Sequence, residues 1–212
     1  PGDGDPVSQA TTAFLSYDDK NLYVAFICKD DPELIRARFS KHDQIMSDDR
    51  TMVNLDTFHD RRNMYWFNVN PYGVQAEGTS TDGVGGSSTW DTLWHSRAQF
   101  TDDGYVAMTI IPFKSIRFSS DKEQRWGLML GRFITRNSEW ATWPYVSDRR
   151  PDFVAQGGSV EGLENISPGR NIQLVPYGLF SRSRYLDAAP KAAPVFQTEN
   201  EARVGLDAKV IL

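Results

Sequence analysis

The chain has 212 residues, a net charge of −5 and a pI near 5.2. This length is enough to bury one full hydrophobic core and to leave an additional segment. The acidic balance and the absence of a Lys/Arg block exclude a general nucleic-acid-binding protein, which would present a basic face. No apolar run approaches the ~18 residues of a membrane helix.

The single cysteine bears on disulfide formation, and the first residues bear on processing of the chain. Cys28 excludes an internal disulfide, and its place in the apolar run 22–28 predicts a buried, inert thiol. Residues 1–6 lack the basic and apolar parts of a signal peptide. Because the sequence does not begin with methionine, we expect it to be processed or incomplete.

Short β-rich runs separated by turn residues occupy the first third of the chain. Residues 11–17 and 22–29 flank Asp-Asp-Lys-Asn, and residues 51–58 and 63–69 flank His-Asp-Arg-Arg. Both patterns predict hairpins, because Asp and Asn side chains favour turns. Asn-Pro-Tyr-Gly then leads into a further predicted strand at 74–79.

The same pattern continues to residue 146. Residues 90–100 and 105–111 flank Asp-Asp-Gly, a strong hairpin signal, and predicted strands follow at 125–135 and 140–146. Strands of this length and spacing, with almost no helical periodicity, predict an all-β protein with an antiparallel β-sandwich.

Three segments differ from this pattern. Residues 31–39 are the best helical candidate, and the Gly- and Ser-rich residues 79–89 predict an exposed mobile loop. Residues 112–118 predict a short irregular turn that lets Ile116 and Phe118 pack beneath the sheet.

The tail alternates as an outer-membrane barrel strand would. Residues 171–185 alternate loosely, and within 196–212 every second residue from Ala202 is apolar. A transmembrane β-strand needs ~9 to 11 tilted residues with one lipid face and one lumen face. A half-buried sandwich strand has the same period and remains the alternative.

An ordered set of short motifs carries a family resemblance. It comprises Tyr-Asp-Asp-Lys-Asn-Leu-Tyr-Val-Ala-Phe at 17–26, Leu-Asp-Thr-Phe at 55–58, Phe-Asn-Val-Asn-Pro-Tyr-Gly at 67–73, Trp-Asp-Thr-Leu-Trp at 90–94, Ile-Pro-Phe-Lys-Ser-Ile-Arg-Phe at 111–118 and Trp-Gly at 126–127. The set resembles carbohydrate-binding module family 9-like domains at the front of bacterial outer-membrane proteins. In that group a barrel domain of unassigned function follows, and its opening resembles Gly-Leu at 162–163, Ile-Ser-Pro-Gly-Arg at 166–170 and Val-Gly-Leu-Asp-Ala-Lys at 204–209.

The resemblance covers about residues 10–212 and implies a domain plan. We expect a sandwich at 1–147, a linker at 148–169 and the first strands of an outer-membrane β-barrel at 170–212. The family's opening strand is missing here or reduced to residues 1–6, which would leave an exposed sheet edge.

The resemblance also implies a function. We expect non-catalytic binding of a polysaccharide or glycoconjugate at the outer membrane of a Gram-negative cell, with the sandwich in the periplasm or at the cell surface. The barrel would contact outer-membrane lipid. The alternative is a structural or docking domain that caps the barrel and binds a protein partner in the envelope.

Exposed aromatic side chains are the expected sugar-binding groups, because they cover the apolar side of a pyranose while polar groups bond its hydroxyls. Trp90 and Trp94 are four residues apart, so in a strand they would share a face. Trp140 and Trp143 would point to opposite faces. Core packing is the competing interpretation of each of these tryptophans, and Trp126 is assigned to the core.

The resemblance implies that a terminal sugar lies clamped between two tryptophans. Polar groups expected to bond hydroxyls or acidic groups are Asp91, Arg132 and Arg136.

Metal, haem and catalytic sites have weaker support. Asp48, Asp49 and Asp56 are candidate calcium ligands, although solvated turn aspartates explain them as well. The three histidines lack a short-spaced metal pair, so zinc is not expected. Haem ligation by the methionines and histidines is a less favoured alternative, because nothing pairs them at a recognisable spacing. No motif joins two acidic residues or forms a nucleophile elbow, so an enzyme is not expected.

Overall fold

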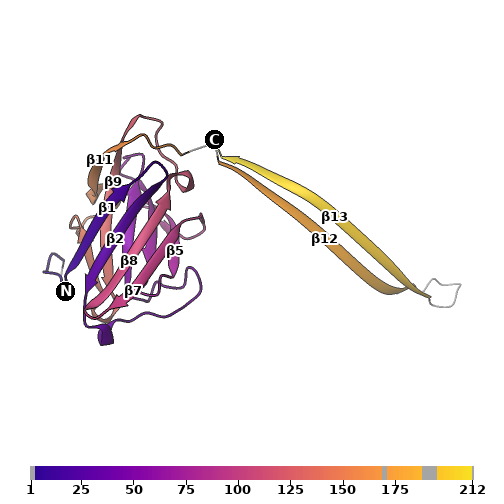
Figure 1. Cartoon of the computed structure of the whole chain (residues 1–212), viewed down its shortest axis with the longest axis horizontal. Coiled ribbons are helices and arrows are strands. Elements are labelled where there is room, and N and C mark those ends of the chain that lie inside the picture. The colour runs from indigo at the N-terminus through magenta and orange to yellow at the C-terminus, as the bar shows by residue number, and fades with distance from the viewer. Residues whose placement is uncertain (1–2, 169–170, 188–194, 212) are drawn as a thin grey trace. The chain divides into compact units, whose positions relative to one another are not determined.

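The protein is described by a computed structural model over residues 3–168, 171–187 and 195–211. It divides into two units, Pro1–Pro168 and Gly169–Leu212. The first unit is an antiparallel β-sandwich, as the sequence predicts, and the sheet that contains β1, β2, β8 and β7 faces the viewer in Figure 1.

Two sheets make the sandwich. The first has the order β1-β2-β8-β7 and contains β1 (Thr11–Tyr17), β2 (Asn21–Lys29), β7 (His95–Thr101) and β8 (Gly104–Pro112). The second has the order β10-β9-β3-β4-β5-β6 and contains β3 (Arg50–Asp56), β4 (Asn63–Val69), β5 (Gln75–Thr81), β6 (Gly85–Ser87), β9 (Glu123–Ile134) and β10 (Glu139–Trp143). Strand β11 (Gly158–Glu164) also pairs with β9. Four short 3-10 helices lie between strands: η1 (Pro32–Leu34), η2 (Phe113–Ser115), η3 (Thr135–Asn137) and η4 (Val154–Gln156).

The predicted hairpins are confirmed, and side chains in their turns explain them. Between β1 and β2, the Asp18 carboxylate accepts from the amides of Lys20 and Asn21 at 2.8 and 2.7 Å. Between β7 and β8, Gly104 has a φ of 138°, and a Cβ there would lie 2.0 Å from the Cys28 carbonyl oxygen. Only glycine fits this close approach.

Several segments differ from the predictions. Residues 31–39 contain only η1, which the Asp31 side chain caps by accepting from the Glu33 amide. The predicted mobile loop at 79–89 contains β6, because Gly85 and Gly86 allow pairing with β5. The predicted linker at 148–169 contains η4 and β11, and the second of these belongs to the sandwich sheet.

The core lies between the sheets and contains the residues predicted for it. Trp126 is fully buried and contacts Phe113 and Phe118, with ring centroids 6.1 and 5.2 Å apart. Ile116 and Phe118 are buried below the sheet, as predicted for the irregular turn. Cys28 is buried as well, and burial raises the pKa of its thiol to about 11.

A buried ion-pair cluster joins the two sheets. Asp30 follows β2, and its carboxylate accepts from Arg132 Nη2 of β9 at 2.5 Å and from Arg136 Nη2 at 2.7 Å. The side chains of Asp30 and Arg132 are both fully buried. Arg132 Nη1 also donates to the Lys29 carbonyl at 2.8 Å, so both ends of the pair are tied to the strands.

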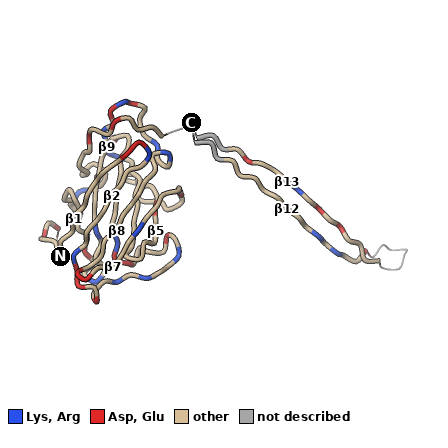
Figure 2. The backbone as a smooth tube through the Cα atoms, in the orientation of Figure 1, with Lys and Arg blue, Asp and Glu red and all other residues tan. Residues whose placement is uncertain are grey.

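The second unit is one long hairpin of β12 (Asn171–Asp187) and β13 (Val195–Ile211). One face carries Leu174, Pro176, Gly178 and Phe180 of β12 opposite Ala208, Leu206, Val204 and Ala202 of β13. The other face includes pairs such as Val175 with Asp207 and Leu179 with Arg203, and Figure 2 shows charged residues along both strands. Over these residues the hairpin therefore has one apolar face and one mixed face, and nearer the turn the first face carries Arg182 and Arg184. Within the described residues, no helix is long and apolar enough to cross a membrane.

Removing Asp30 should strongly destabilise the sandwich. In Asp30→Asn, the buried Arg132 guanidinium loses its compensating charge, which typically costs about 3–5 kcal/mol. Urea unfolding measures this loss. The control is Asp103→Asn, because the Lys29–Asp103 pair is more than half exposed and should contribute little. Equal effects of the two substitutions would contradict the role of the buried cluster.

Candidate functional site

The outer face of the second sheet contains a groove of about 370 Å³, which we call the outer groove. Strand alternation places Arg50, Met52 and Asn54 of β3 on this face, and Met64, Trp66 and Asn68 of β4 beside them. The remaining lining residues are Met46, Ser80, Gly86, Ser88, Trp140 and Phe153.

Trp66 lies against the bare backbone of Gly78. The two residues are opposite each other in the β4–β5 register. A Cβ on Gly78 would lie 2.3 Å from Trp66 Cζ2 and 2.1 Å from the Ser87 carbonyl oxygen. The indole Nε1 donates to the Thr79 carbonyl at 3.1 Å. Glycine and this hydrogen bond therefore fix the ring against the sheet, where it forms part of the groove floor.

Trp140 also lines the outer groove, and its side chain is 53% exposed. Its ring lies 5.5 Å from that of Phe133, centroid to centroid. The Arg50 guanidinium carbon lies 4.4 Å from the Phe133 centroid and 5.6 Å from the Trp140 centroid. Arg50 Nη1 donates to the carbonyls of Met46 and Asp48 at 2.7 and 3.2 Å. The aromatic and cationic groups are thus held in place by contacts within the protein.

Two polar atoms of groove-lining residues remain without a protein partner. Asn68 Oδ1 and Arg50 Nε are buried and have no protein hydrogen-bond partner. An unsatisfied buried polar group typically costs about 1–3 kcal/mol. One such acceptor and one such donor belong to residues that line a groove with two tryptophans, which makes this groove the candidate ligand site.

A larger cavity of about 540 Å³ lies between β1 and the strands β9, β10 and β11. We call it the edge cavity, and apolar side chains such as Leu15, Phe26 and Leu130 dominate its lining. Its arginine, Arg132, is already paired with Asp30. The edge cavity also has a tryptophan, Trp143, and two unpartnered polar atoms, Thr11 Oγ1 and Arg132 Nε, whereas the outer groove combines such atoms with two tryptophans. Because sugar recognition relies on aromatic faces, the outer groove is the better candidate despite its smaller volume.

The structure corrects the prediction for Trp90 and Trp94. Strand β7 begins only at His95, so the two tryptophans do not stand side by side in a strand. Trp94 is 4% exposed and packs against Phe67 with ring centroids 5.1 Å apart. Trp90 is half-buried and packs against Tyr65 at 4.7 Å. Both belong to the core of the sandwich.

The polar residues predicted to bind sugar are also placed elsewhere. Arg132 is buried and Arg136 is mostly buried, and both bind Asp30, so they do not reach a ligand in the outer groove. Asp91 is exposed and does not line the groove. Trp140 lines the outer groove, whereas Trp143 lines the edge cavity, as expected for residues on opposite faces.

The predicted calcium ligands serve as acceptors for neighbouring loops. Asp56 accepts from two backbone amides at 3.1 and 2.7 Å. Asp48 accepts from the amide of Arg38 at 3.2 Å, and Asp49 from that of Thr135 at 2.7 Å. Burial raises the pKa of Asp56, while these backbone amides lower it. The structure therefore does not bring the three carboxylates together as a cation site.

A different group has metal-ligand geometry in the described part of the chain. His42, Asp43 and Glu77 each place one ligand atom within 4.8 Å of the others.

The methionines considered for haem include Met64 and Met129, which pack together with Val154 in a small second core cluster.

Sequence reasoning missed Trp66, Arg50, Asn54 and Asn68. A signal was present for Trp66, because Met64, Trp66 and Asn68 alternate with the core residues of the same strand. The predicted strand at 74–79 contains a lone glycine, Gly78, and the observed β4–β5 register places it opposite Trp66. An aromatic residue across from such a glycine indicates a ring that lies on the sheet.

Comparisons with known proteins agree with this fold. A family model described as carbohydrate family 9 binding domain-like matches residues 5–146. A Bacteroides uniformis structure has a TM-score of 0.60 at 12% identity, and the match covers 74% of this chain and 79% of that chain. A carbohydrate binding module family 9 from Caldicellulosiruptor kristjanssonii in complex with glucose has a TM-score of 0.53 at 13% identity, with 77% and 80% covered.

A second structure of such a module from the same organism, in complex with cellotriose, has a TM-score of 0.53 at 14% identity, with 74% and 77% covered. At these identities the likeness to solved structures shows the fold alone. No curated protein sequence matches the chain.

Gly78→Ala should disturb the packing of the Trp66 ring against the sheet. The added Cβ would overlap the Trp66 ring and the Ser87 carbonyl, and overpacking of this kind typically costs about 1–3 kcal/mol. Urea unfolding, with near-UV circular dichroism of the tryptophans, measures the change. Gly86→Ala is the matched control, because its Cβ would meet no atom closer than 3.9 Å. An unaffected Gly78→Ala would show that the ring does not depend on glycine.

Proposed function

The chain belongs to the carbohydrate family 9 binding domain-like family, and from this premise we propose that its outer groove binds carbohydrate without catalysing a reaction. The observation that carries the proposal is the combination of Trp66 and Trp140 with buried, unpartnered polar atoms of Asn68 and Arg50. Sugar recognition needs both kinds of group.

Each part of the groove has a role in this proposal. Trp66 offers an indole held against the sheet, and Trp140 of β10 offers an exposed ring in the same groove. A clamp between two tryptophans, as the family resemblance implies, would use this pair. Asn68 and Arg50 would supply hydrogen bonds to the sugar hydroxyls.

Relatives with the same fold support a ligand class. The family 9 modules with the same fold were solved in complex with glucose and with cellotriose. We therefore infer that the outer groove takes a β-linked glucose oligosaccharide, or another polysaccharide or glycoconjugate that presents a pyranose face.

Trp140→Ala and Trp66→Ala should each weaken oligosaccharide binding at least about tenfold, because each removes one aromatic face. Isothermal titration with glucose, cellotriose and a wider oligosaccharide panel measures the affinity. Trp143→Ala is the matched control: it removes a tryptophan with 57% exposure, close to the 53% of Trp140, but from the edge cavity. No detectable binding of any oligosaccharide in the panel, or an equal loss of affinity in all three variants, would contradict the proposal.

We also propose that β12 and β13 are strands of an outer-membrane barrel, which would place the sandwich in the periplasm or at the cell surface. Supporting this, the apolar face runs unbroken from Leu174 to Phe180 and from Ala202 to Ala208, and Val204 is 89% exposed. A two-stranded hairpin is marginally stable alone in water, so lipid and further strands would cover this face. A protein partner in the envelope remains the alternative way to cover it.

Lipid contact can be tested with single cysteines in the native membrane protein. Val204→Cys, labelled with a fluorophore, should be quenched by a lipid-soluble quencher, whereas Arg203→Cys on the other face should not. The buried Cys28 thiol, with a pKa of about 11, should add little background labelling. Equal quenching at both positions, or co-purification of a protein that protects Val204→Cys, would exclude the lipid face.

A further inference from the structure

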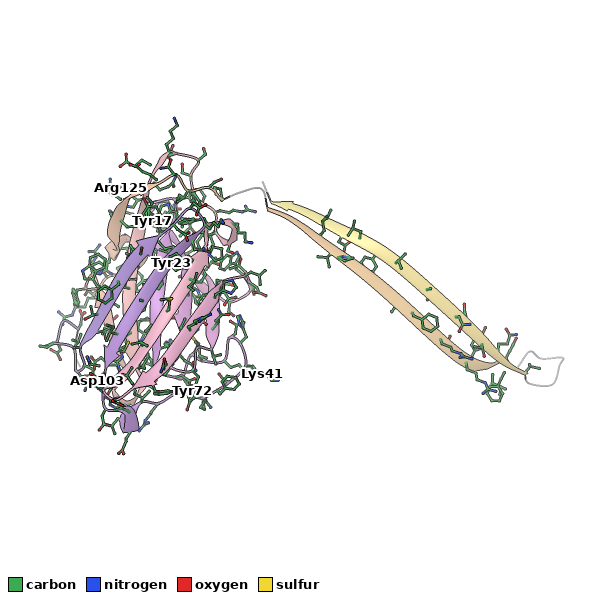
Figure 3. All side chains as sticks on the ribbon, viewed as in Figure 1. Tyr17, Tyr23, Lys41, Tyr72, Asp103 and Arg125 are labelled. Carbon is green, nitrogen blue, oxygen red and sulfur yellow. The ribbon has the colours of Figure 1, made fainter. Side chains whose placement is uncertain are left out.

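His42, Asp43 and Glu77 converge where the loop between β2 and β3 meets β5. His42 Nε2 lies 3.1 Å from each carboxylate oxygen of Glu77. It also lies 3.5 Å from Asp43 Oδ1. Lys41, the preceding residue, marks this part of the loop in Figure 3. One imidazole nitrogen therefore faces carboxylate oxygens from two residues.

Glu77 is the unusual member because it is only 1% exposed. It lies opposite Phe67 in the β4–β5 register and so faces the sandwich interior. Burial raises the pKa of its carboxyl, and the carboxyl of Asp91 beside it raises it further, whereas His42 and the Trp94 indole lower it. Its Oε2 has no hydrogen-bond partner of good geometry. A buried carboxylate of this kind needs a stronger positive partner.

The loop is held in position by its backbone. The Asp43 amide donates to the Gln75 carbonyl at 3.0 Å, at the start of β5. Asp43 has a φ of 66°, a conformation that costs energy for a residue other than glycine. These features place the Asp43 carboxylate next to that of Glu77, where two like charges repel.

A simple ion pair between protonated His42 and Glu77 explains only part of this arrangement. The imidazole Nε2 carries one proton, which can be donated to one carboxylate at a time. Glu77 and Asp43 supply two acidic groups around that single nitrogen. A divalent cation would satisfy these acidic groups at once and would also bind the neutral imidazole.

We propose that His42, Asp43 and Glu77 bind a divalent transition-metal ion of the Zn²⁺ class. Two ligand atoms at ordinary zinc distances lie about 3.4 Å apart in a tetrahedral site, close to the separations found here. The imidazole nitrogen favours such an ion over calcium, which prefers oxygen ligands. The bound ion would fasten the loop to β5, on the interior side of the sheet that carries the outer groove.

The experiment uses tag-free protein stripped with a chelator and then titrated with Zn²⁺. Isothermal titration should give one site, and the melting temperature should rise with Zn²⁺ because the ion binds the folded state. His42→Ala and Glu77→Gln should each weaken Zn²⁺ binding at least tenfold. Glu77→Gln keeps the side-chain shape, and near-UV circular dichroism confirms that each variant is folded.

His95→Ala is the matched control, since His95 is an exposed histidine outside the cluster. It should bind Zn²⁺ as the parent does, and Ca²⁺ should not compete. Absence of saturable Zn²⁺ binding, or unchanged affinity in folded His42→Ala or Glu77→Gln, would overturn the proposal. The result is independent of carbohydrate binding, because no residue of the cluster lines the outer groove.

Discussion

The architecture depends on burial of β3 on both of its faces. All seven residues of this strand are buried, although strand alternation sends successive side chains to opposite sides. Val53 and Leu55 point into the core, whereas Met52 and Asn54 point into the outer groove. A shift of one residue in the register would exchange the two sets and lose both environments. The same pairing that builds the core therefore also builds the groove.

Buried polar groups fall into two kinds in this sandwich. Asp30 and Arg132 compensate each other, and they join two sheets that would otherwise contact mainly through apolar side chains. Asn68 and Glu77 are buried with an oxygen that lacks a partner of good geometry. The first kind is explained by the fold alone, because its cost is offset inside the protein. The second kind is not, and these two examples lie at the two proposed ligand sites.

The parts of the structure that sequence reasoning predicted correctly are local. The turn after Asp18 is made by hydrogen bonds within a few residues, so its composition was sufficient to predict the β1–β2 hairpin. The candidate site depends on distant segments instead. Arg132 was expected to be free for a ligand, but its partner Asp30 is 102 residues away. Similarly, the outer groove combines Trp66 of β4 with Trp140 of β10, and only the strand order brings them to one face.

The lone cysteine offers an internal reporter for the motions of the core. Because Cys28 is 1% exposed and its thiol has a pKa of about 11, attack by a thiol reagent requires that the sheets separate around it. Its reaction rate at fixed pH is then governed by how often the interior opens, in the same way as hydrogen exchange of a protected amide. The labelling rate of Cys28 thus reports how often the structure opens between β2 and its neighbours, without any engineered label.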